Sequence, residues 1–199
     1  RTITGLKKSG FNDIRIGYTA SKHNVSHLEK VYNLSQDLGI EFTMSIVHNS
    51  DNYFSIDTNQ SPDSDELEDQ LKNVIYKEYR SINPRRLLRT YYLKGLIDYS
   101  RTKKRALTCQ ALDDFFFLDS FGNVFPCNML EKSIGNIRES SFEEIWNSDK
   151  KQKLRNYCKN CNDCWMVCTA KSSIRREAIK VSTQVLKEAI PARLKTMTT

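Results

Sequence analysis

The feature that most constrains this chain is the placement of its cysteines. The first 108 residues contain none, and four of the six cysteines lie within the eleven residues from 158 to 168. The full set is Cys109, Cys127, Cys158, Cys161, Cys164 and Cys168. Cysteines two residues apart are poor disulfide partners, but their thiolates can easily point at one metal centre. We therefore expect metal or cluster binding in a reducing compartment, the cytoplasm, with disulfides and free thiols as the alternatives.

Length and composition exclude several other classes of protein. A chain of 199 residues with 10% aromatic residues can bury a core, so whole-chain disorder is excluded. No apolar run approaches the roughly 20 residues that cross a bilayer, so we expect no membrane span. The chain begins with Arg1 and a strand-like Thr2-Ile3-Thr4 rather than with Met, and we expect it to be a piece of a longer protein.

The net charge of +7 includes a basic cluster that could attract nucleic acid or another acidic partner. The cluster consists of Arg101, Lys103, Lys104 and Arg105. No nucleic-acid motif or aromatic platform accompanies it. An acid–base match within the molecule is the simpler interpretation, and we expect no nucleic-acid partner.

Residues 3 to 50 predict a strand–helix–strand unit. Strand-like sequence at 13–19 and 41–47 encloses a stretch with helical apolar spacing at 25–38, which Gly39 ends. Short connections around a helix imply parallel strands, and ligands of such sheets bind at the carboxyl ends of the strands. Those ends are 19–24 and 48–51. Two strands do not bury both faces of a sheet, so we expect the rest of this sheet upstream of Arg1.

The remainder of the chain predicts a helical middle and a mixed second half. The predicted parts are a solvated linker at Ser55 to Ser64, a helix from Asp65 to Tyr79, a second helix opened by Asn83-Pro84, a hairpin of 115–119 and 124–127 around Gly122, a short strand at 134–137, a helix capped by Ser140 or Ser141 that runs into Cys158, and a basic amphipathic helix from Ala170 to about Ile190. The last helix is expected to cover the core, with membrane-surface binding as the alternative.

The spacing Cys158-x2-Cys161-x2-Cys164-x3-Cys168 is that of the bacterial ferredoxin run, with Thr169 in place of the usual proline. In that run three thiolates hold one [4Fe–4S] cluster and the fourth reaches another. Zinc sites more often pair two separated knuckles, so the spacing favours iron–sulfur over zinc. Cys109 and Cys127 flank the predicted hairpin and need further ligands. Either Cys168 joins them in a three-plus-three arrangement, or a single cluster uses this pair and two of the downstream four.

Several ordered motifs resemble the SPASM/twitch domain of radical SAM enzymes. They are Cys109-x12-Gly122-x4-Cys127, then Ile134-Gly135-Asn136-Ile137, then residues 141–148, then the cysteine run. Residues 1–57 are similar to the last part of the partial (β/α)6 barrel that precedes this domain. The resemblance implies an α/β fold that begins with the C-terminal part of a radical SAM barrel (1–57). A helical linker (58–104), a small α+β SPASM/twitch domain (105–170) and a covering helix with a tail (171–199) follow.

The resemblance also implies an auxiliary role for one or two [4Fe–4S] clusters. Such clusters anchor substrate or transfer electrons in oxidoreductases, typically those that modify peptides or proteins. By position, Cys109, Cys127 and Cys168 match the first auxiliary cluster, and Cys158, Cys161 and Cys164 match the second. The family's usual run is Cys-x2-Cys-x5-Cys-x3-Cys, followed by a further cysteine that is absent here. Each cluster would therefore take a fourth ligand from water, a carboxylate, substrate or an upstream residue, or only one cluster forms.

The chain lacks the Cys-x3-Cys-x2-Cys loop with which this family binds and cleaves S-adenosylmethionine. We therefore expect the isolated chain to be inactive and the intact protein to generate a 5′-deoxyadenosyl radical. The implied partners are the upstream half of the barrel, a peptide or protein substrate and a reductant protein. Asn24, in the loop after a strand, is the candidate for approaching S-adenosylmethionine. The alternatives are a non-catalytic zinc-binding interaction module and a ferredoxin-like electron carrier.

Residues near the cysteines and the histidines complete the set of candidates. Trp165 and Met166 lie between cysteines and are expected to shield the cluster from water. His23, His27 and His48 are a further possible metal set, although surface histidines are the simpler account.

Overall fold

The computed structural model describes residues 1–49 and 58–194 of the chain. The helices are α1 (Thr2–Lys8), α2 (Leu28–Asp37), α3 (Ser64–Tyr79), α4 (Pro84–Thr102), α5 (Phe142–Trp146), α6 (Asp149–Lys159), α7 (Val167–Arg176) and α8 (Ala178–Leu194), with a 3-10 turn at Val25–His27. The strands are β1 (Arg15–Ala20), β2 (Glu41–Ile46), β3 (Phe117–Leu118), β4 (Asn123–Phe125) and β5 (Gly135–Asn136). None of these helices combines the length and apolar character that a membrane crossing demands.

The strand–helix–strand prediction is confirmed. β1 and β2 pair in parallel from Arg15 with Glu41 to Ala20 with Ile46, and α2 connects them. Gly39 ends the connection with a φ of +60°, a conformation that glycine adopts without steric cost. One face of this sheet is buried, as its alternating pattern requires. The other face is more open, and the expected remainder of the barrel stays a prediction.

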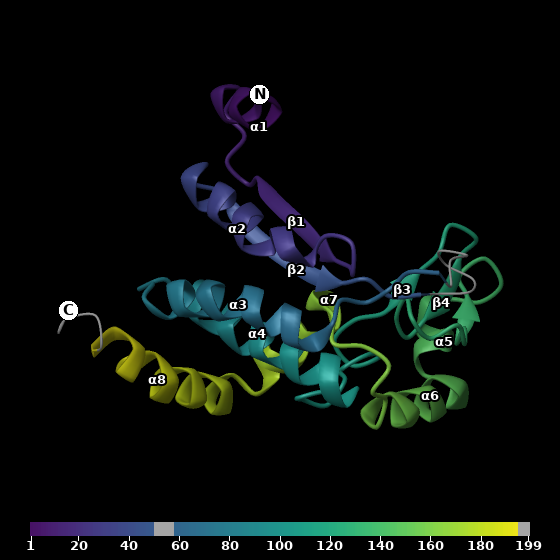
Figure 1. The fold of residues 1–199 in the computed structure, drawn as a ribbon. Helices are drawn as coiled ribbons and strands as arrows, with labels where there is room; N and C mark the ends of the chain where they lie inside the picture. Colours follow the sequence, from purple (N-terminus) through teal and green to yellow (C-terminus); the bar gives the residue numbers. More distant parts are fainter. Residues whose placement is uncertain (50–57, 195–199) are drawn as a thin grey trace.

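The strand-like interpretation of Thr2-Ile3-Thr4 is wrong, because these residues lie in α1. The helix bonds locally, beginning with the Gly5 amide on the Arg1 carbonyl at 3.0 Å. A β-rich sequence becomes a strand only where it packs against a neighbouring strand. No residue of α1 is buried, and Figure 1 shows the helix standing off the body of the chain. Local helical bonding therefore decides the conformation.

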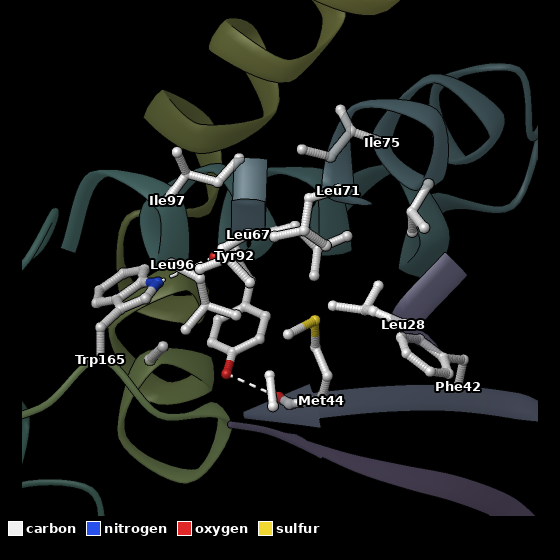
Figure 2. Close-up of a cluster of buried hydrophobic side chains, with 14 of the residues drawn as sticks. Leu28, Phe42, Met44, Leu67, Leu71, Ile75, Tyr92, Leu96, Ile97 and Trp165 are labelled. Atoms are coloured by element: carbon white, nitrogen blue, oxygen red, sulfur yellow. Dashed lines mark hydrogen bonds between the residues drawn. The ribbon is translucent and has the colours of Figure 1, made fainter. Parts of the chain in front are cut away.

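The main core lies between the sheet, α3, α4 and the C-terminal helices. Asp63 caps α3 by accepting from the Asp65 and Glu66 amides, and Asn83 caps α4 ahead of Pro84. These caps confirm the two predicted helices. Figure 2 shows the side chains of α3 and α4 meeting those of the sheet. The buried side chains of this core include Leu28 of α2, Trp165 of the loop after α6, and Phe42, Met44, Leu67, Leu71, Tyr92 and Leu96.

The described part of the predicted linker is largely exposed, as expected of a solvated segment, and it is also hydrogen-bonded to the loops after β1 and β2. Residues 50–57, which include its first part, lie outside the described residues. The Gln60 carbonyl accepts from the Lys22 amide at 2.9 Å, and the Asn59 amide donates to Asn49 Oδ1 at 3.0 Å. Pro62 is buried. Hydrogen bonds and the buried Pro62 therefore attach the described part of the linker to the loops at the carboxyl ends of β1 and β2.

The second half contains the predicted hairpin and a small core of its own. β3, β4 and β5 form an antiparallel sheet, and Gly122 makes the turn with a φ of +90°. The buried members of this core are Leu112, Val124, Ile134 and Ile145. Ser141 begins α5 with a capping box to Glu144. The helix predicted to run from here into Cys158 is in fact α5 and α6, because the Ser148 side chain caps a new helix.

The predicted helix from Ala170 to Ile190 is likewise two helices. α7 begins earlier, at Val167, and α8 follows after a break at Glu177, whose φ and ψ are −101° and 30°. Both helices pack on the main core: α7 contacts α4 and β2, while α8 lies against α3 and α4. The buried Val181, Val185 and Ala189 confirm that α8 covers the core (Figure 1).

Candidate metal centre

The six cysteines come from five parts of the fold and all carry free thiols. Cys109 lies between α4 and β3, Cys127 follows β4, Cys158 lies in α6, Cys161 and Cys164 lie in the loop after it, and Cys168 lies in α7. Cys109, Cys158 and Cys164 are buried, Cys127 and Cys161 are half-buried, and Cys168 is exposed. Because all six thiols are free, no disulfide competes with metal binding in the described part of the chain. Cys161 Sγ also lies 3.3 Å from Asp163 Oδ2.

Cys109 and Cys158 share one buried cluster with Ala111, against which Phe115 and Leu130 pack. This contact joins the segment before the hairpin to α6. Burial, with smaller contributions from the thiolates of Cys109, Cys127 and Cys161, raises the pKa of Cys158 to about 12. The structure therefore brings the hairpin pair close to the first two cysteines of the run.

The other thiols interact with the same centre. Burial raises the pKa of Cys127 to about 11, against the effect of nearby backbone amides, and Cys164 and Cys109 add to the rise. Burial also raises the pKa of Cys161 to about 12, with a smaller contribution from Cys109. Cys109 thus contributes to the raised pKa of four other thiols, those of Cys127, Cys158, Cys161 and Cys164. Burial first, and neighbouring thiolates second, keep these four thiols protonated until a cation or cluster compensates the charge.

Cys164 has a polar environment that sequence analysis missed. Arg105 Nη1 donates to the Cys164 carbonyl at 2.6 Å and lies 3.7 Å from its Sγ. Thr169 Oγ1 lies 3.5 Å from the same sulfur. Burial raises the pKa of this thiol, while Thr169 and Arg105 lower it. The position of Arg105 four residues before Cys109 was the only signal in the sequence.

The rest of the basic cluster partly follows the expected acid–base match. Arg101 Nη2 pairs with Asp65 Oδ1 at 2.6 Å and also with Glu68. Both carboxylates belong to α3. Arg105 instead turns inward to the cysteine run, so the cluster is not one solvated face.

Trp165 fastens the cysteine run to the main core. Its side chain is buried, and its Nε1 donates to the Tyr92 carbonyl at 3.0 Å. Tyr92 OH in turn donates to the Met44 carbonyl in β2 at 2.9 Å, and Figure 2 shows both bonds. The indole lies so close to Gly95 that a Cβ there would meet Nε1 at 2.5 Å. The residue after Cys164 is therefore fixed to both α4 and the sheet.

A cavity of about 190 Å³ lies at the carboxyl end of β2, with Cys164 in its wall. Its lining includes Val47, His48, Tyr99, Lys103, Asp163 and Met166. Burial lowers the pKa of His48, which favours the neutral imidazole. The cavity lies where a parallel sheet is expected to present its ligand site. A molecule bound here would lie beside the cysteine run.

Asn24 lies in the loop after β1, as expected, but its side chain bonds within that loop. Nδ2 donates to the Thr19 carbonyl at 3.0 Å, and Oδ1 accepts from the Ser21 amide at 2.8 Å. Its role toward S-adenosylmethionine stays a prediction. His23 and His27 are exposed, which fits the simpler account of these histidines.

The donor set fits an iron–sulfur cluster, because it consists of thiols gathered from the hairpin and the dense run. Across residues 1–49 and 58–194, no three His, Cys, Asp or Glu side chains lie close enough to enclose one metal ion. A four-iron cluster holds its thiolates farther apart than a single zinc ion does. The division of the six cysteines between clusters stays a prediction.

Comparison with known proteins identifies the same region. Residues 109–165 match the family described as SPASM, an iron–sulfur cluster-binding domain. The chain is also similar to an "AdoMet-dependent heme synthase" of Methanosarcina barkeri (strain Fusaro / DSM 804). The two are 29% identical over 177 residues, which cover 78% of this chain and 48% of the relative. The chain thus spans about half the length of that relative. No solved structure matches the chain.

Proposed function

We propose, for a chain that carries the C-terminal SPASM part of a radical SAM protein, that its cysteines hold an auxiliary [4Fe–4S] cluster beside the substrate. One observation carries the proposal: Cys164 forms part of the wall of the cavity at the carboxyl end of β2. When bound and held by four thiolates, such a cluster would supply one-electron chemistry. The chain's own residues bind the cluster, fix the cysteine run to the sheet through Trp165, and keep water away.

For the ligands we propose one cluster held by Cys109, Cys127 and two of the downstream thiols. Cys109 contributes to the raised pKa of Cys158, Cys161 and Cys164. It also packs with Cys158 in one group of buried side chains. Cys168 is exposed, lies in α7, and has Cys164 as its neighbouring thiolate. The alternative is the three-plus-three arrangement, in which Cys168 joins Cys109 and Cys127.

Metal content after anaerobic reconstitution tests the proposal. About four irons with equal acid-labile sulfide per chain would support one cluster, and about eight would support two. About one zinc without sulfide would support the zinc-binding interaction module and overturn the auxiliary-cluster function.

Two alanine variants separate the arrangements. Cys109→Ala should lose the cluster, whereas Cys168→Ala should keep about four irons with an unchanged spectrum. If the two variants instead show the same altered spectrum, the three-plus-three arrangement holds. Cys161→Ala should also lower the iron content, and unchanged iron would remove Cys161 from the ligand set.

For the substrate we propose a side chain of a peptide or protein. The cavity of about 190 Å³ is below the roughly 300–1,000 Å³ of pockets for drug-sized ligands. This size suits one side chain better than a large flat ring system. The relative named a heme synthase supports a second candidate, a step in haem synthesis. Haemin titrated into the reconstituted chain distinguishes the two, because a saturable shift of its absorbance band would favour the second.

The activity itself belongs to the whole protein and is part of the proposal. We propose that the enzyme cleaves S-adenosylmethionine through a cluster loop that this chain lacks, with a reductant protein as electron source. Reductant and S-adenosylmethionine added to the isolated chain should yield no 5′-deoxyadenosine. Clear formation of that product would overturn the proposal that cleavage requires a cluster loop outside this chain.

A further inference from the structure

Arg105 connects three segments that carry cysteines. Its guanidinium donates from Nε to the Leu107 carbonyl at 3.2 Å, on the segment leading to Cys109. Nη1 donates to the Cys164 carbonyl at 2.6 Å and to Thr169 Oγ1 in α7 at 3.0 Å. The Arg105 amide itself donates to Asn162 Oδ1 at 2.8 Å. One side chain therefore fixes the positions of the approaches to Cys109, Cys164 and Cys168.

The guanidinium is also stacked on an aromatic ring, and the residue is half-buried. Its Cζ lies 5.2 Å from the ring centroid of the buried Trp165, and Nη2 donates to Ser173 Oγ at 3.3 Å. Stacking on an aromatic face restricts the planar guanidinium group to one orientation. This orientation places Nη1 at 3.7 Å from Cys164 Sγ.

Arg105 differs from other arginines of the chain in its partners. Arg101, Arg155 and Arg176 each pair with a carboxylate. Within the described ranges, the ion pairs do not include Arg105, whose partners are carbonyls, hydroxyls and a sulfur. A partly buried cation without a counter-charge is costly. A thiolate-bound cluster is an anion that would supply this counter-charge.

We propose that Arg105 is a positioning residue and the counter-cation of the auxiliary cluster, and that it makes reduction of that cluster easier. The inference rests on the proposed function. Reduction adds one electron and thus one negative charge to the thiolate-bound irons. A fixed positive charge nearby stabilises the reduced state more than the oxidised one. Net charge and hydrogen bonds to the sulfurs are among the factors that set cluster potentials.

The test is a redox titration of the anaerobically reconstituted full chain, followed by electron paramagnetic resonance. Arg105→Gln removes the charge and keeps hydrogen-bonding capacity, while Arg105→Lys keeps the charge. At a fixed potential, Arg105→Gln should lower the ratio of reduced to oxidised cluster about tenfold, equivalent to 59 mV for one electron. In Arg105→Lys, the ratio of reduced to oxidised cluster should stay close to that of the unchanged chain. The matched control is Arg101→Gln, which removes a cation whose partners lie in α3, and its ratio should not change.

The outcomes separate this inference from the proposed function. If the unchanged chain binds no iron and sulfide, the proposed function fails. If it binds a cluster and both Arg105 variants titrate as it does, only the role of Arg105 is overturned. Equal shifts in both variants would overturn the role of its charge. A failure of both variants to bind iron would show a purely structural role and also overturn the inference.

Discussion

Gly95 leaves the space that the indole ring of Trp165 occupies. A Cβ at this position would lie 2.5 Å from Nε1 and 2.6 Å from Cε2 of a ring that is held by the Tyr92 carbonyl. We expect Gly95→Ala to lower the free energy of unfolding by about 1–3 kcal/mol, because overpacking displaces a buried ring. Urea denaturation followed by circular dichroism measures this. The displaced ring should also move Cys164, so the variant should bind less iron.

Gly5→Ala is the matched control for this prediction. Nothing lies within 4 Å of a Cβ built at Gly5, which is inside α1. Replacing a helical glycine by alanine stabilises a helix by roughly 0.5–1 kcal/mol. A loss of stability in Gly5→Ala as large as that in Gly95→Ala would show that steric contact with Trp165 is not the cause.

Asp114 gives the metal-free chain a predictable response to acid. The Arg176 guanidinium, with help from Ser172, lowers the pKa of Asp114 to about 2. Because the pKa is lowered on folding, this carboxylate stabilises the fold above its ordinary range near 4, and the contribution disappears as the pH falls toward 2. Asp114→Asn should therefore lose less stability than the unchanged chain between pH 5 and pH 2.5. Parallel pH dependence of the two urea midpoints would contradict this.

At the level of helices and strands, Glu78 joins α3, α4 and α2. Its carboxylate is fully buried and accepts from Arg86, Arg89 and Tyr32 at 3.0, 3.2 and 2.5 Å. Removing one partner of a buried ion pair leaves the other charges uncompensated, at a cost of about 3–5 kcal/mol. Glu78→Gln should lower the free energy of unfolding, measured by urea denaturation, by nearly that amount. Glu66→Gln, on the exposed side of the same helix, should change stability by less than about 0.5 kcal/mol.

The helices and strands that sequence predicted well are those with local signals. Asn83 before Pro84, Gly39 after α2 and Gly122 in the hairpin act within their own turns, so the pattern sufficed. The breaks between α5 and α6 and between α7 and α8 were missed. The first break had a local signal in Ser148, the new cap, but the apolar spacing continued across it. The second, at Glu177, depends on how α7 and α8 each pack on the same main core, and that is a tertiary effect.

The site was predictable to a similar extent. The six cysteines are candidate ligands from their spacing alone, and that assignment stays a prediction. Arg105 has no such signal, because Asn162, Cys164 and Thr169 lie 57 to 64 residues away in sequence. Trp165 was expected to shield the cluster. Its attachment to Tyr92 and Gly95 depends on how α4 packs. Long-range contacts of this kind leave no periodic trace in a single sequence.

Over the whole molecule, the apolar interior is divided very unevenly. The main core runs from Tyr18 in β1 to Ala189 in α8 and includes Trp165. The hairpin has only Leu112, Val124, Ile134 and Ile145 buried in its own core. So small a core gives marginal stability unless a metal or cluster adds to it. The thiols that would add it, Cys109 and Cys158, adjoin the hairpin and α6.

The uneven division predicts how the chain responds when a cluster binds. In the metal-free chain, amide hydrogens of residues 115–147 should exchange much faster than those of α3 and α4, because the small core opens locally. Reconstitution should slow exchange in 115–147 about tenfold or more, since a group that binds only the folded hairpin stabilises it. Exchange in α3, which supplies no cysteine, should change little and is the internal control. Hydrogen–deuterium exchange mass spectrometry before and after reconstitution measures both regions in one sample. Equal slowing of both would show that the chain opens as one cooperative unit, with cluster binding linked to the main core rather than to the hairpin.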